Sequence, residues 1–480
     1  MPAVPERLRP LLAADSPLQR LAGRFTGAGH CLYLVGGSVR DALLGSDAAR
    51  SDLDLTTDAR PDDVEALVDG WADSVWLAGK GFGTVGAMAS GMRFEITTFR
   101  AEAYVADSRK PKVVFGDRLE DDLARRDFTV NAMALSLPDP TLVDPFGGLA
   151  DLAARTLRTP LAPEVSFGED PLRMLRAARF MATLGFQPVA EIESAVASLR
   201  RRLEIVSGER IRDELGKLIV AVDPSPGLWF LVRTGLAEEF LPELPALALE
   251  QDPIHRHKDV LAHTIAVVGK TRPELTVRLA ALLHDVGKPK TRSIGPTGVS
   301  FHHHDAVGAR MADERLRALR FPRETIETVT ALVALHLRFH TYKMGWSDRA
   351  VRRYVRDAGA LLDDLNHLVR CDCTTRSETR AKALERRMDE LEARVAELRT
   401  KEELDSLRPP LDGHQVMAFL GVSPGRVVGE ALGALFEMRL DEGPIEEDEA
   451  YRRLADWATE RGLTTVGYRV PDAAPPETGA

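Results

Sequence analysis

The strongest constraint on the fold of this chain lies in the segment GGSVRDALLGSDAARSDLDL, residues 36–55. Near its end, Asp52 and Asp54 stand two positions apart in an apolar-flanked run that is typical of a β-strand. Because side chains alternate along a strand, both carboxylates are expected to project from one face. Two carboxylates on one face can hold two hard cations, which suits in-line attack at phosphorus.

The same segment begins with Gly36, Gly37 and Ser38, which can form a tight turn. The backbone N–H groups of such a turn can point at a triphosphate, and glycine adopts the backbone angles that the turn needs. Taken separately, a glycine pair is usually an ordinary turn, and an Asp-x-Asp pair is usually a solvated strand end. Their combination at this spacing is far more specific.

A third carboxylate for the same cation site is offered by Glu95 in MRFEITTFR. If this run is a strand, Phe94, Ile96 and Thr98 share one face, and Glu95 and Thr97 share the other. Alternation alone describes the solvent side of any surface strand equally well, so both interpretations stay open.

Two arginines, Arg125 and Arg126, precede an aspartate in RRDFTVNAMAL. Such a pair can grip a triphosphate and orient a ribose hydroxyl. The alternative is a surface arginine pair neutralised by Asp121 and Asp122. Further candidate residues of this segment are Asp127 and Asn131.

The segment GEDPLRMLRAARF predicts the start of a helix, because proline favours the first helical position and Pro171 lies there. With that start, Glu169, Asp170 and Arg173 are expected to share one helix face. The spacing by itself fits an ordinary helical salt bridge, which is the alternative to a binding role.

Ten of the twelve histidines lie between residues 255 and 375. Among them, the doublet His284-Asp285 in LHDVGKP can place an imidazole and a carboxylate on one divalent metal. Isolated doublets of this kind are common and usually structural. The other candidate ligands around it are His263, His304, His336 and Asp372.

The head motifs, in this order, resemble the nucleotidyltransferase superfamily that includes DNA polymerase β, and in particular its bacterial class II CCA-adding and poly(A) polymerase branch. The resemblance implies that Asp52, Asp54 and Glu95 are catalytic and hold Mg²⁺. The positions that it implies for nucleotide binding are Gly36, Gly37, Ser38, Arg40, Asp41, Arg125, Arg126, Asp127, Asn131, Glu169, Asp170, Arg173 and Arg176.

In that branch the E-D-x-x-R segment selects the incoming base without a template, which would make Asp170 and Arg173 base readers supported by Glu169 and Arg176. The implied reaction is two-metal addition of CCA from CTP and ATP to tRNA, which is bound at its 3′ end and acceptor stem. Residues 100–118 resemble the flexible loop of enzymes that add CCA or A. Full CCA addition is favoured, whereas A-only addition and poly(A) polymerase activity stay open.

The histidine segment resembles an HD phosphohydrolase domain. The resemblance implies that His263, His284, Asp285 and Asp372 hold one divalent transition metal of unspecified identity. His304 and His336 would then serve a second metal or the phosphate. The implied activity is removal of a 2′-phosphate or a 2′,3′-cyclic phosphate.

A protein uridylyltransferase-type signalling enzyme also joins a nucleotidyltransferase to an HD domain, and it is the further alternative. Such an enzyme would lack the E-D-x-x-R segment and would continue into sensing domains, for which this sequence has no candidate.

The expected fold is an α+β head, with a DNA polymerase β-like nucleotidyltransferase sheet, followed by a mostly α-helical neck, HD domain and tail. A 3,4,3,4,3 spacing of apolar residues over 381–398 predicts a long amphipathic helix. The expected boundaries are 20–150 for the head, 151–250 for the neck with its RNA- and base-binding region, 251–376 for the HD domain, 377–470 for the long helix and tail, and 471–480 for a disordered end.

The net charge of −10 weighs mildly against RNA binding, although affinity for phosphates depends on local arginine patches more than on the total. Three cysteines do not make a disulfide framework, and the sequence has no run of 18 apolar residues. The chain is therefore expected to be cytoplasmic, with no membrane partner, and its oligomeric state stays open.

Overall fold

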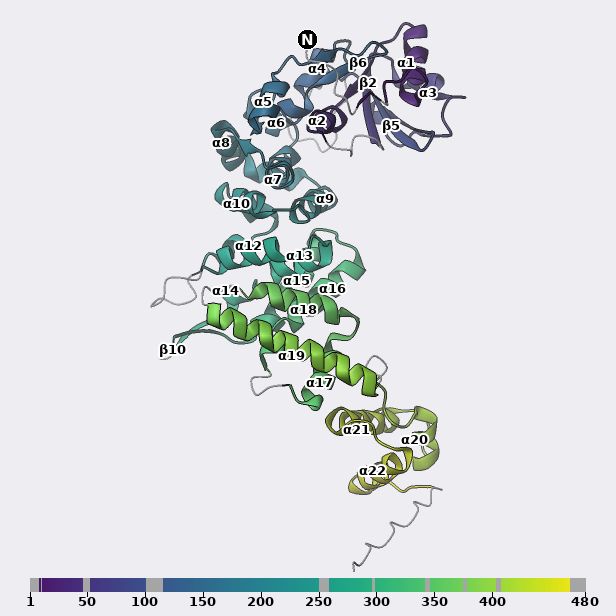
Figure 1. The fold of residues 1–480 in the computed structure, drawn as a ribbon, viewed down its shortest axis with the longest axis vertical. Helices are drawn as coiled ribbons and strands as arrows, with labels where there is room; N and C mark the ends of the chain where they lie inside the picture. Colours follow the sequence, from purple (N-terminus) through teal and green to yellow (C-terminus); the bar gives the residue numbers. More distant parts are fainter. Residues whose placement is uncertain are drawn as a thin grey trace, which may run out of the picture. The chain divides into compact units, whose positions relative to one another are not determined.

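The protein is described here by a computed structural model (Figure 1). The described residues are 8–9, 11–45, 52–100, 115–249, 259–295, 298–341, 346–373, 378–402 and 407–466. The expected disordered end and most of the expected flexible loop lie outside these residues. The chain divides into two compact units, one built around the head sheet and neck helices, the other around the later helices.

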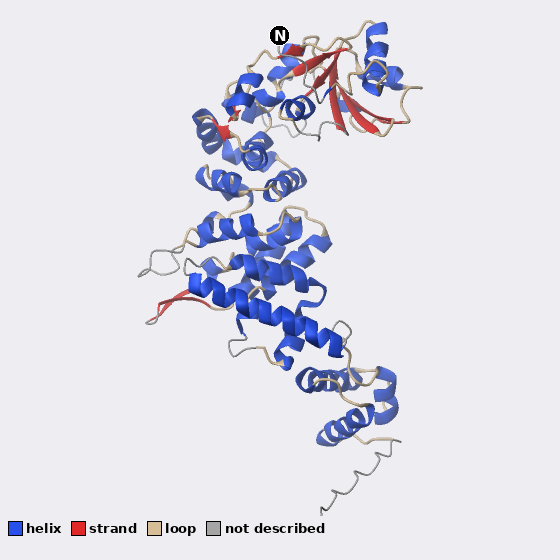
Figure 2. Ribbon diagram, viewed as in Figure 1, coloured by secondary structure: helices blue, strands red, loops and turns tan. Residues whose placement is uncertain are grey.

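The head is a seven-stranded sheet with the strand order β3-β4-β5-β2-β1-β6-β7 (Figure 2). Its strands pair antiparallel except β2 and β5, which run parallel. Their bounds are β1 Leu32–Val35, β2 Asp52–Thr57, β3 Ser74–Trp76, β4 Thr84–Ala89, β5 Met92–Thr98, β6 Ala134–Leu137 and β7 Leu142–Val143. The α+β head is thereby confirmed.

The alternation expected for both acidic strands is present. In β5, Phe94, Ile96 and Thr98 are buried, while Glu95 and Thr97 are only partly covered. In β2, Asp52 and Asp54 are exposed and the leucines beside them are buried. Because apolar side chains occupy one face of each strand, the carboxylates are left together on the other.

Short helices flank the sheet, and local chemistry sets where they begin. In α1, Ser16 caps the helix by accepting a hydrogen bond from the Gln19 amide, and Pro17 takes the first turn. In α2, the preceding Gly36 has a φ of 70°, which favours glycine. The helical elements of the head are α1 Pro17–Gly27, α2 Gly37–Leu43, α3 Pro61–Val68, η3 Lys80–Phe82, α4 Leu119–Ala124 and η4 Thr129–Asn131.

The neck is helical, with two helices in close backbone contact. A Cβ at Gly227 of α10 would lie 2.4 Å from the Ala178 carbonyl oxygen of α7, so only glycine permits this approach. The neck elements are α5 Gly148–Ala154, β8 Thr156–Leu157, α6 Pro163–Glu169, α7 Leu172–Leu184, β9 Gln187–Pro188, α8 Ala190–Leu199, η5 Arg200–Ile205, α9 Gly208–Ile219, α10 Ser225–Arg233, α11 Ala237–Phe240 and η6 Pro245–Leu247.

The expectation that Glu169, Asp170 and Arg173 share one helix face is wrong. Glu169 is the last residue of α6, Asp170 is extended with a φ of −133°, and Arg173 lies in the first turn of α7. The physical reason is Pro171, whose ring disfavours the helical conformation for the residue before it. The chain therefore breaks at Asp170, and its carboxylate is free to face a different partner.

The remaining elements are almost all helices (Figure 2). They are α12 Val260–Lys270, α13 Leu275–Leu283, α14 Lys288–Thr291, β10 Arg292–Gly295, β11 Gly298–Phe301, α15 His304–Ala318, α16 Arg323–Leu335, η7 Arg338–Thr341, α17 Asp348–Ala358, η8 Gly359–Leu361, α18 Leu362–Asp372, α19 Glu378–Glu402, α20 Gly413–Leu420, α21 Arg426–Glu442 and α22 Glu447–Glu460.

The predicted long helix is α19, and its apolar seam is confirmed because Met388, Leu391, Val395 and Leu398 are buried. Helices α20, α21 and α22 pack around a small core of their own. None of the helices in the described part of the chain is long and apolar enough to span a bilayer.

Candidate active sites in the head and the histidine region

The head and neck enclose a cleft of about 410 Å³. Eight of the predicted site residues line it: Asp54, Glu95, Arg125, Arg126, Asp127, Asp170, Arg173 and Arg176. Five lining residues were not predicted as site residues: Val35, Leu55, Thr97, Arg100 and Arg210. Residues from six separate segments therefore converge on one concave, strongly charged site.

The register of the sheet brings two predicted carboxylates together. Asp54 of β2 is the direct partner of Glu95 of β5, and Asp52 is the direct partner of Arg93. Register partners in parallel strands project to the same side of the sheet, so Asp54 and Glu95 share the cleft. Asp52 begins β2 and is exposed, but it is not among the lining residues.

The electrostatics of Asp54 reflect this crowding. Partial withdrawal from water raises its pKa, nearby Arg126 opposes that shift, and the carboxylates of Glu95 and Asp52 add to it. Glu95 is engaged by Arg93, whose Nη2 lies 2.6 Å from Glu95 Oε1. Neighbouring carboxylates are a donor set suited to Mg²⁺, a hard cation that prefers oxygen ligands.

The glycine turn comes close to this carboxylate. A Cβ at Gly36 would lie 3.1 Å from Arg126 Nη1 and 3.5 Å from Asp54 Oδ2, so a larger residue would press on both groups. Ser38 Oγ donates to the Asp52 carbonyl oxygen at 3.2 Å and ties the turn to β2. Gly37 follows as the first residue of α2. The turn lies beside the site, although its residues are not part of the cleft lining.

Arg40, Asp41 and Asn131 are also not among the lining residues and instead support the cleft from behind. Arg40 Nε donates to Asp41 Oδ1 at 2.8 Å, and its Nη1 donates to Asn131 Oδ1 at 2.6 Å. Asn131 Nδ2 in turn donates to Asp127 Oδ1 at 2.9 Å. This chain of hydrogen bonds fixes the Asp127 carboxylate, which does reach the cleft.

Asp127 anchors an arginine of the neck. Arg176 Nε donates to Asp127 Oδ2 at 2.7 Å, and Glu214 lies 3.6 Å from the same guanidinium. Burial alone would raise the pKa of Asp127, but Arg176 and the Asn131 hydrogen bond hold that pKa well below its usual value. Arg176 is therefore held at the cleft by two carboxylates.

The residues expected to read the base also line the cleft. Arg173 is 8% exposed, and its Nη1 donates to the Ser166 carbonyl at 3.1 Å and to Glu169 Oε2 at 3.3 Å. Its Nη2 donates to the Arg125 carbonyl oxygen. These contacts hold the planar guanidinium in one orientation, which a base-reading role requires.

Asp170 has a partner that sequence reasoning missed. Its Oδ1 accepts from the Leu172 amide at 3.1 Å, while its Oδ2 accepts from Arg210 Nη2 at 2.8 Å. Arg210 lies in α9, forty residues further along. No local spacing links the two positions, so only the packing of the neck helices could identify Arg210 as a cleft residue.

The second candidate site is a buried histidine centre. Three histidines donate through Nδ1 to the backbone carbonyl three residues earlier: His284 to Ala281 at 2.8 Å, His304 to Phe301 at 2.8 Å, and His336 to Val333 at 2.6 Å. This arrangement fixes the tautomer and leaves Nε2 of each ring available as a metal ligand.

The Nε2 atoms converge on the carboxylates. His284 Nε2 lies 3.2 Å from Asp285 Oδ2 and 3.5 Å from Asp372 Oδ1, and His304 Nε2 lies 3.5 Å from Asp285 Oδ1. Burial opposes the charged imidazole, but Asp285 and Asp372 raise the pKa of His284 to about 10. Burial and the neighbouring His284 lower the pKa of His336 to about 4.

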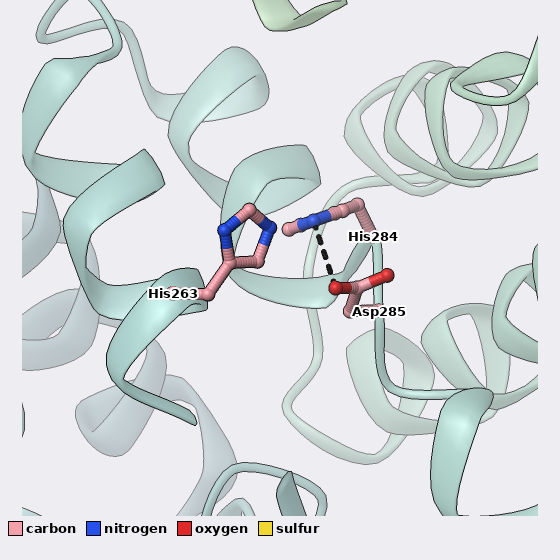
Figure 3. Close-up of side chains that lie close together, drawn as sticks. All are labelled: His263, His284 and Asp285. Carbon is pink, nitrogen blue, oxygen red and sulfur yellow. Dashed lines mark ion pairs between the residues drawn. The ribbon is translucent and has the colours of Figure 1, made fainter. Parts of the chain in front are cut away.

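Two sets of three side chains present ligand atoms within 4.8 Å of one another. The buried set is Asp285, His304 and His336, and the other is His263, His284 and Asp285 (Figure 3). Buried imidazoles with fixed tautomers around a carboxylate suit a divalent transition metal. All six predicted residues of this centre, Asp372 included, are thus placed in this neighbourhood by the described contacts.

Fold and sites together define a nucleotidyltransferase head joined to an HD-type histidine centre. Family models match in the same order: "Poly A polymerase head domain" over residues 32–158, "Probable RNA and SrmB- binding site of polymerase A" over residues 185–247, and "HD domain" over residues 260–398.

Curated relatives extend over nearly the whole chain. An A-adding tRNA nucleotidyltransferase of Deinococcus radiodurans is 37% identical over 447 residues, 89% of this chain and 95% of the relative. A CC-adding tRNA nucleotidyltransferase of Thermus thermophilus is 37% identical over 363 residues, 73% of this chain and 80% of the relative. The chain therefore belongs to the bacterial tRNA nucleotidyltransferase family with a poly(A) polymerase head.

Among solved structures, the fold is similar to that of the Bacillus stearothermophilus CCA-adding enzyme in complex with CTP. The TM-score is 0.65 at 24% identity, and the match covers 95% of this chain and 99% of that chain. This likeness confirms the order of sheet head, helical neck and later helices.

Proposed function

We propose that this protein adds CCA to the 3′ end of tRNA from CTP and ATP without a nucleic-acid template. The observation that carries the proposal is the register pairing of Asp54 with Glu95 in a cleft that Asp170 and Arg173 also line. Carboxylates for phosphoryl chemistry and a fixed base-reading pair thereby share one site.

Asp52, Asp54 and Glu95 would hold Mg²⁺, which when bound supplies Lewis-acid activation and charge neutralisation for nucleotidyl transfer. Arg125, Arg126 and Arg176 would bind the triphosphate of the incoming nucleotide, since guanidinium groups contact phosphate through two donors at once.

Base selection would depend on Asp170 and Arg173. Arg173 offers donors in a fixed plane, and Asp170 offers acceptors, so the pair can present hydrogen-bonding edges like those of a base. Glu169 holds Arg173 at 3.3 Å and acts as a support. Asp170 and Arg173 would read both CTP and ATP. The 3′ end and acceptor stem of the tRNA would lie against the head and neck.

A-only addition is the second candidate, because the relative matched over 89% of this chain bears the name A-adding tRNA nucleotidyltransferase. The test uses purified full-length protein with Mg²⁺ and tRNA transcripts that end at the discriminator base, at C or at CC. Each transcript receives CTP, ATP or both, and products are read at single-nucleotide resolution. Ordered addition that stops after CCA supports the proposal, A added only to the CC end supports the second candidate, and no addition overturns both.

We further propose that the histidine centre is a phosphohydrolase site acting on a 2′-phosphate or a 2′,3′-cyclic phosphate. His263, His284, Asp285 and Asp372 would hold one metal, which when bound activates water for attack at phosphorus. His304 and His336 would serve a second metal or contact the phosphate. RNA oligonucleotides with cyclic-phosphate ends should be hydrolysed by the wild type and not by His284→Ala, and equal hydrolysis by both would overturn the proposal.

For the whole chain we propose the organisation expected from the sequence and a cytoplasmic reaction. The free thiols of Cys31, Cys371 and Cys373 suit a reducing compartment. The proposed parts are a head over 20–150, a neck over 151–250, an HD domain over 251–376, a long helix with tail over 377–470, and a disordered end over 471–480.

A further inference from the structure

Asp122 of α4 is a fully buried carboxylate that touches two arginines of the cleft. Its Oδ1 accepts from Arg125 Nε at 3.2 Å and from Arg125 Nη2 at 2.9 Å. Its Oδ2 accepts from Arg126 Nη2 at 3.3 Å. One buried side chain outside the cleft lining therefore holds two guanidinium groups that are part of it.

Two further contacts tie Asp122 to the sheet. Thr56 Oγ1 donates to Asp122 Oδ2 at 3.3 Å, and the Arg100 amide lies 3.4 Å from Asp122 Oδ1. Thr56 stands two residues after Asp54 in β2, so both side chains project from the same face. Asp122 thus fixes the two arginines relative to the strand that carries Asp54.

The charge state of Asp122 agrees with this arrangement. Burial by itself would raise its pKa, but Arg126 and Arg125 outweigh that effect and hold the pKa below its usual value. Asp122 is therefore a buried anion at neutral pH, and its charge is compensated by hydrogen bonds from the two arginines.

We propose that Asp122 is a positioning residue that orients Arg125 and Arg126 to receive the triphosphate of the incoming nucleotide. This inference rests on the proposed function of the cleft. Holding a planar guanidinium by one edge fixes the direction of its other edge, which is how a preorganised site lowers the entropy cost of binding.

A carboxylate beside two arginines can change the affinity for a nucleotide in two opposite directions. Its negative charge repels the triphosphate, so neutralising it would strengthen binding if charge were its main contribution. Its hydrogen bonds order the arginines, so removing them would weaken binding if orientation were its main contribution. The sign of the change in nucleotide affinity therefore separates the two roles, and we infer that orientation dominates.

The experiment measures the dissociation constants of Mg·CTP and Mg·ATP for full-length protein by equilibrium dialysis, so that binding is read without catalysis. Asp122→Asn should raise both constants about tenfold, as expected for loss of a charged hydrogen-bond arrangement. The KM for tRNA should change less than about twofold, because Asp122 is fully buried and cannot contact tRNA itself. The matched control is Asp121→Asn, the same change at the exposed neighbouring residue, which should leave both constants unchanged.

A second variant covers the case in which Asp122→Asn does not fold. Asp122→Glu keeps the negative charge but displaces the carboxylate from both guanidinium groups. It should weaken the binding of both nucleotides if orientation dominates, and leave it unchanged if charge dominates. In a double-mutant cycle, the effect of Asp122→Asn should shrink in an Arg125→Gln background, because the pair acts as one unit.

Tighter or unchanged nucleotide binding in Asp122→Asn would overturn the positioning role, and so would strict additivity with Arg125→Gln. Thr56→Val removes the hydrogen bond to the sheet but leaves both arginine contacts, so it should weaken nucleotide binding by less than Asp122→Asn does. If the wild-type protein binds nucleotide but adds none to any transcript, the proposed function is rejected. The test of Asp122 measures binding alone and remains valid in that case.

Discussion

Asp54 of β2 and Glu95 of β5 are direct partners across the parallel strand pair of the head sheet, although 41 residues separate them in sequence. Parallel pairing points both carboxylates to one side of the sheet, where partial burial, and then the nearby charges of Glu95 and Asp52, raise the pKa of Asp54. The same pairing sets Arg93 beside Asp52, within reach of Glu95.

Replacing Asp54 by Asn should reduce nucleotide addition by about a thousandfold or more, because loss of a metal-ligand charge costs several kcal/mol in the transition state. The measurement is single-turnover addition to a tRNA transcript at saturating Mg²⁺. Asp63→Asn, the same change at an exposed position in α3, is the control and should retain wild-type rates. Hydrolysis at the histidine centre should persist in both variants.

Replacing Arg93 by Gln should lower the Mg²⁺ concentration needed for half-maximal addition, because Arg93 competes with the cation for Glu95. Both side chains are more than 40% exposed, so the ion pair is worth under about 1 kcal/mol and the shift should not exceed about fivefold. A Mg²⁺ titration of the addition rate measures it. An increased Mg²⁺ requirement would instead mean that Arg93 supports the metal-binding conformation of Glu95.

Asp127 should contribute a pH-dependent part of the stability. Its pKa is lowered in the folded state, so the contribution is fully present above the unfolded value near 4 and is lost as pH falls through the lower folded value. Asp127→Asn should therefore lower the thermal midpoint at pH 7, and the difference from wild type should shrink below about pH 4. Calorimetry at a series of pH values measures the difference between the thermal midpoints of wild type and Asp127→Asn. A difference that is the same at every pH would contradict a pH-dependent contribution from Asp127.

Arg352 and Glu402 should be coupled contributors to the stability of the second unit. Arg352 is 4% exposed and donates to Glu402 through Nε at 2.7 Å and through Nη2 at 2.8 Å, and its Nη1 donates to the Leu440 carbonyl at 3.3 Å. Arg352→Ala leaves a buried carboxylate unpaired and should cost about 3–5 kcal/mol.

The double variant Arg352→Met/Glu402→Leu should recover much of this loss, since replacing both ions by apolar groups leaves no buried charge unpaired. Arg349→Ala, which removes an ion pair of a largely exposed arginine with Asp441, is the matched control. Denaturant unfolding compares the three variants. If Arg352→Ala and Arg349→Ala lower the free energy of unfolding equally, burial does not set the strength of the Arg352 contacts.

Much of the head could be predicted because its signals are local. The alternation in DLDLTT and MRFEITT set the strand faces of Asp54 and Glu95, and the spacing over residues 381–398 set the buried seam of α19. The spacing of residues 169–173 does not predict the break before Pro171, because the steric restriction that proline places on Asp170 outweighs helix-face spacing.

Other site residues could not be predicted because their partners are distant in the chain. Arg210 reaches Asp170 only because α9 packs against α7. Asp122 accepts a hydrogen bond from Thr56, which lies 66 residues away in the chain. Arg40 and Asn131 carry local motif signals, yet packing places them behind the cleft rather than in its lining.

The residue types, the order of the motifs and the strand face that carries the acids can all be read from the sequence. The strand face follows from backbone periodicity and local sterics. The tertiary structure alone decided which carboxylates are neighbours and which arginines are held by buried anions. The physical reason is that strand register and helix packing result from burying apolar surface over the whole domain, and no short segment encodes that outcome.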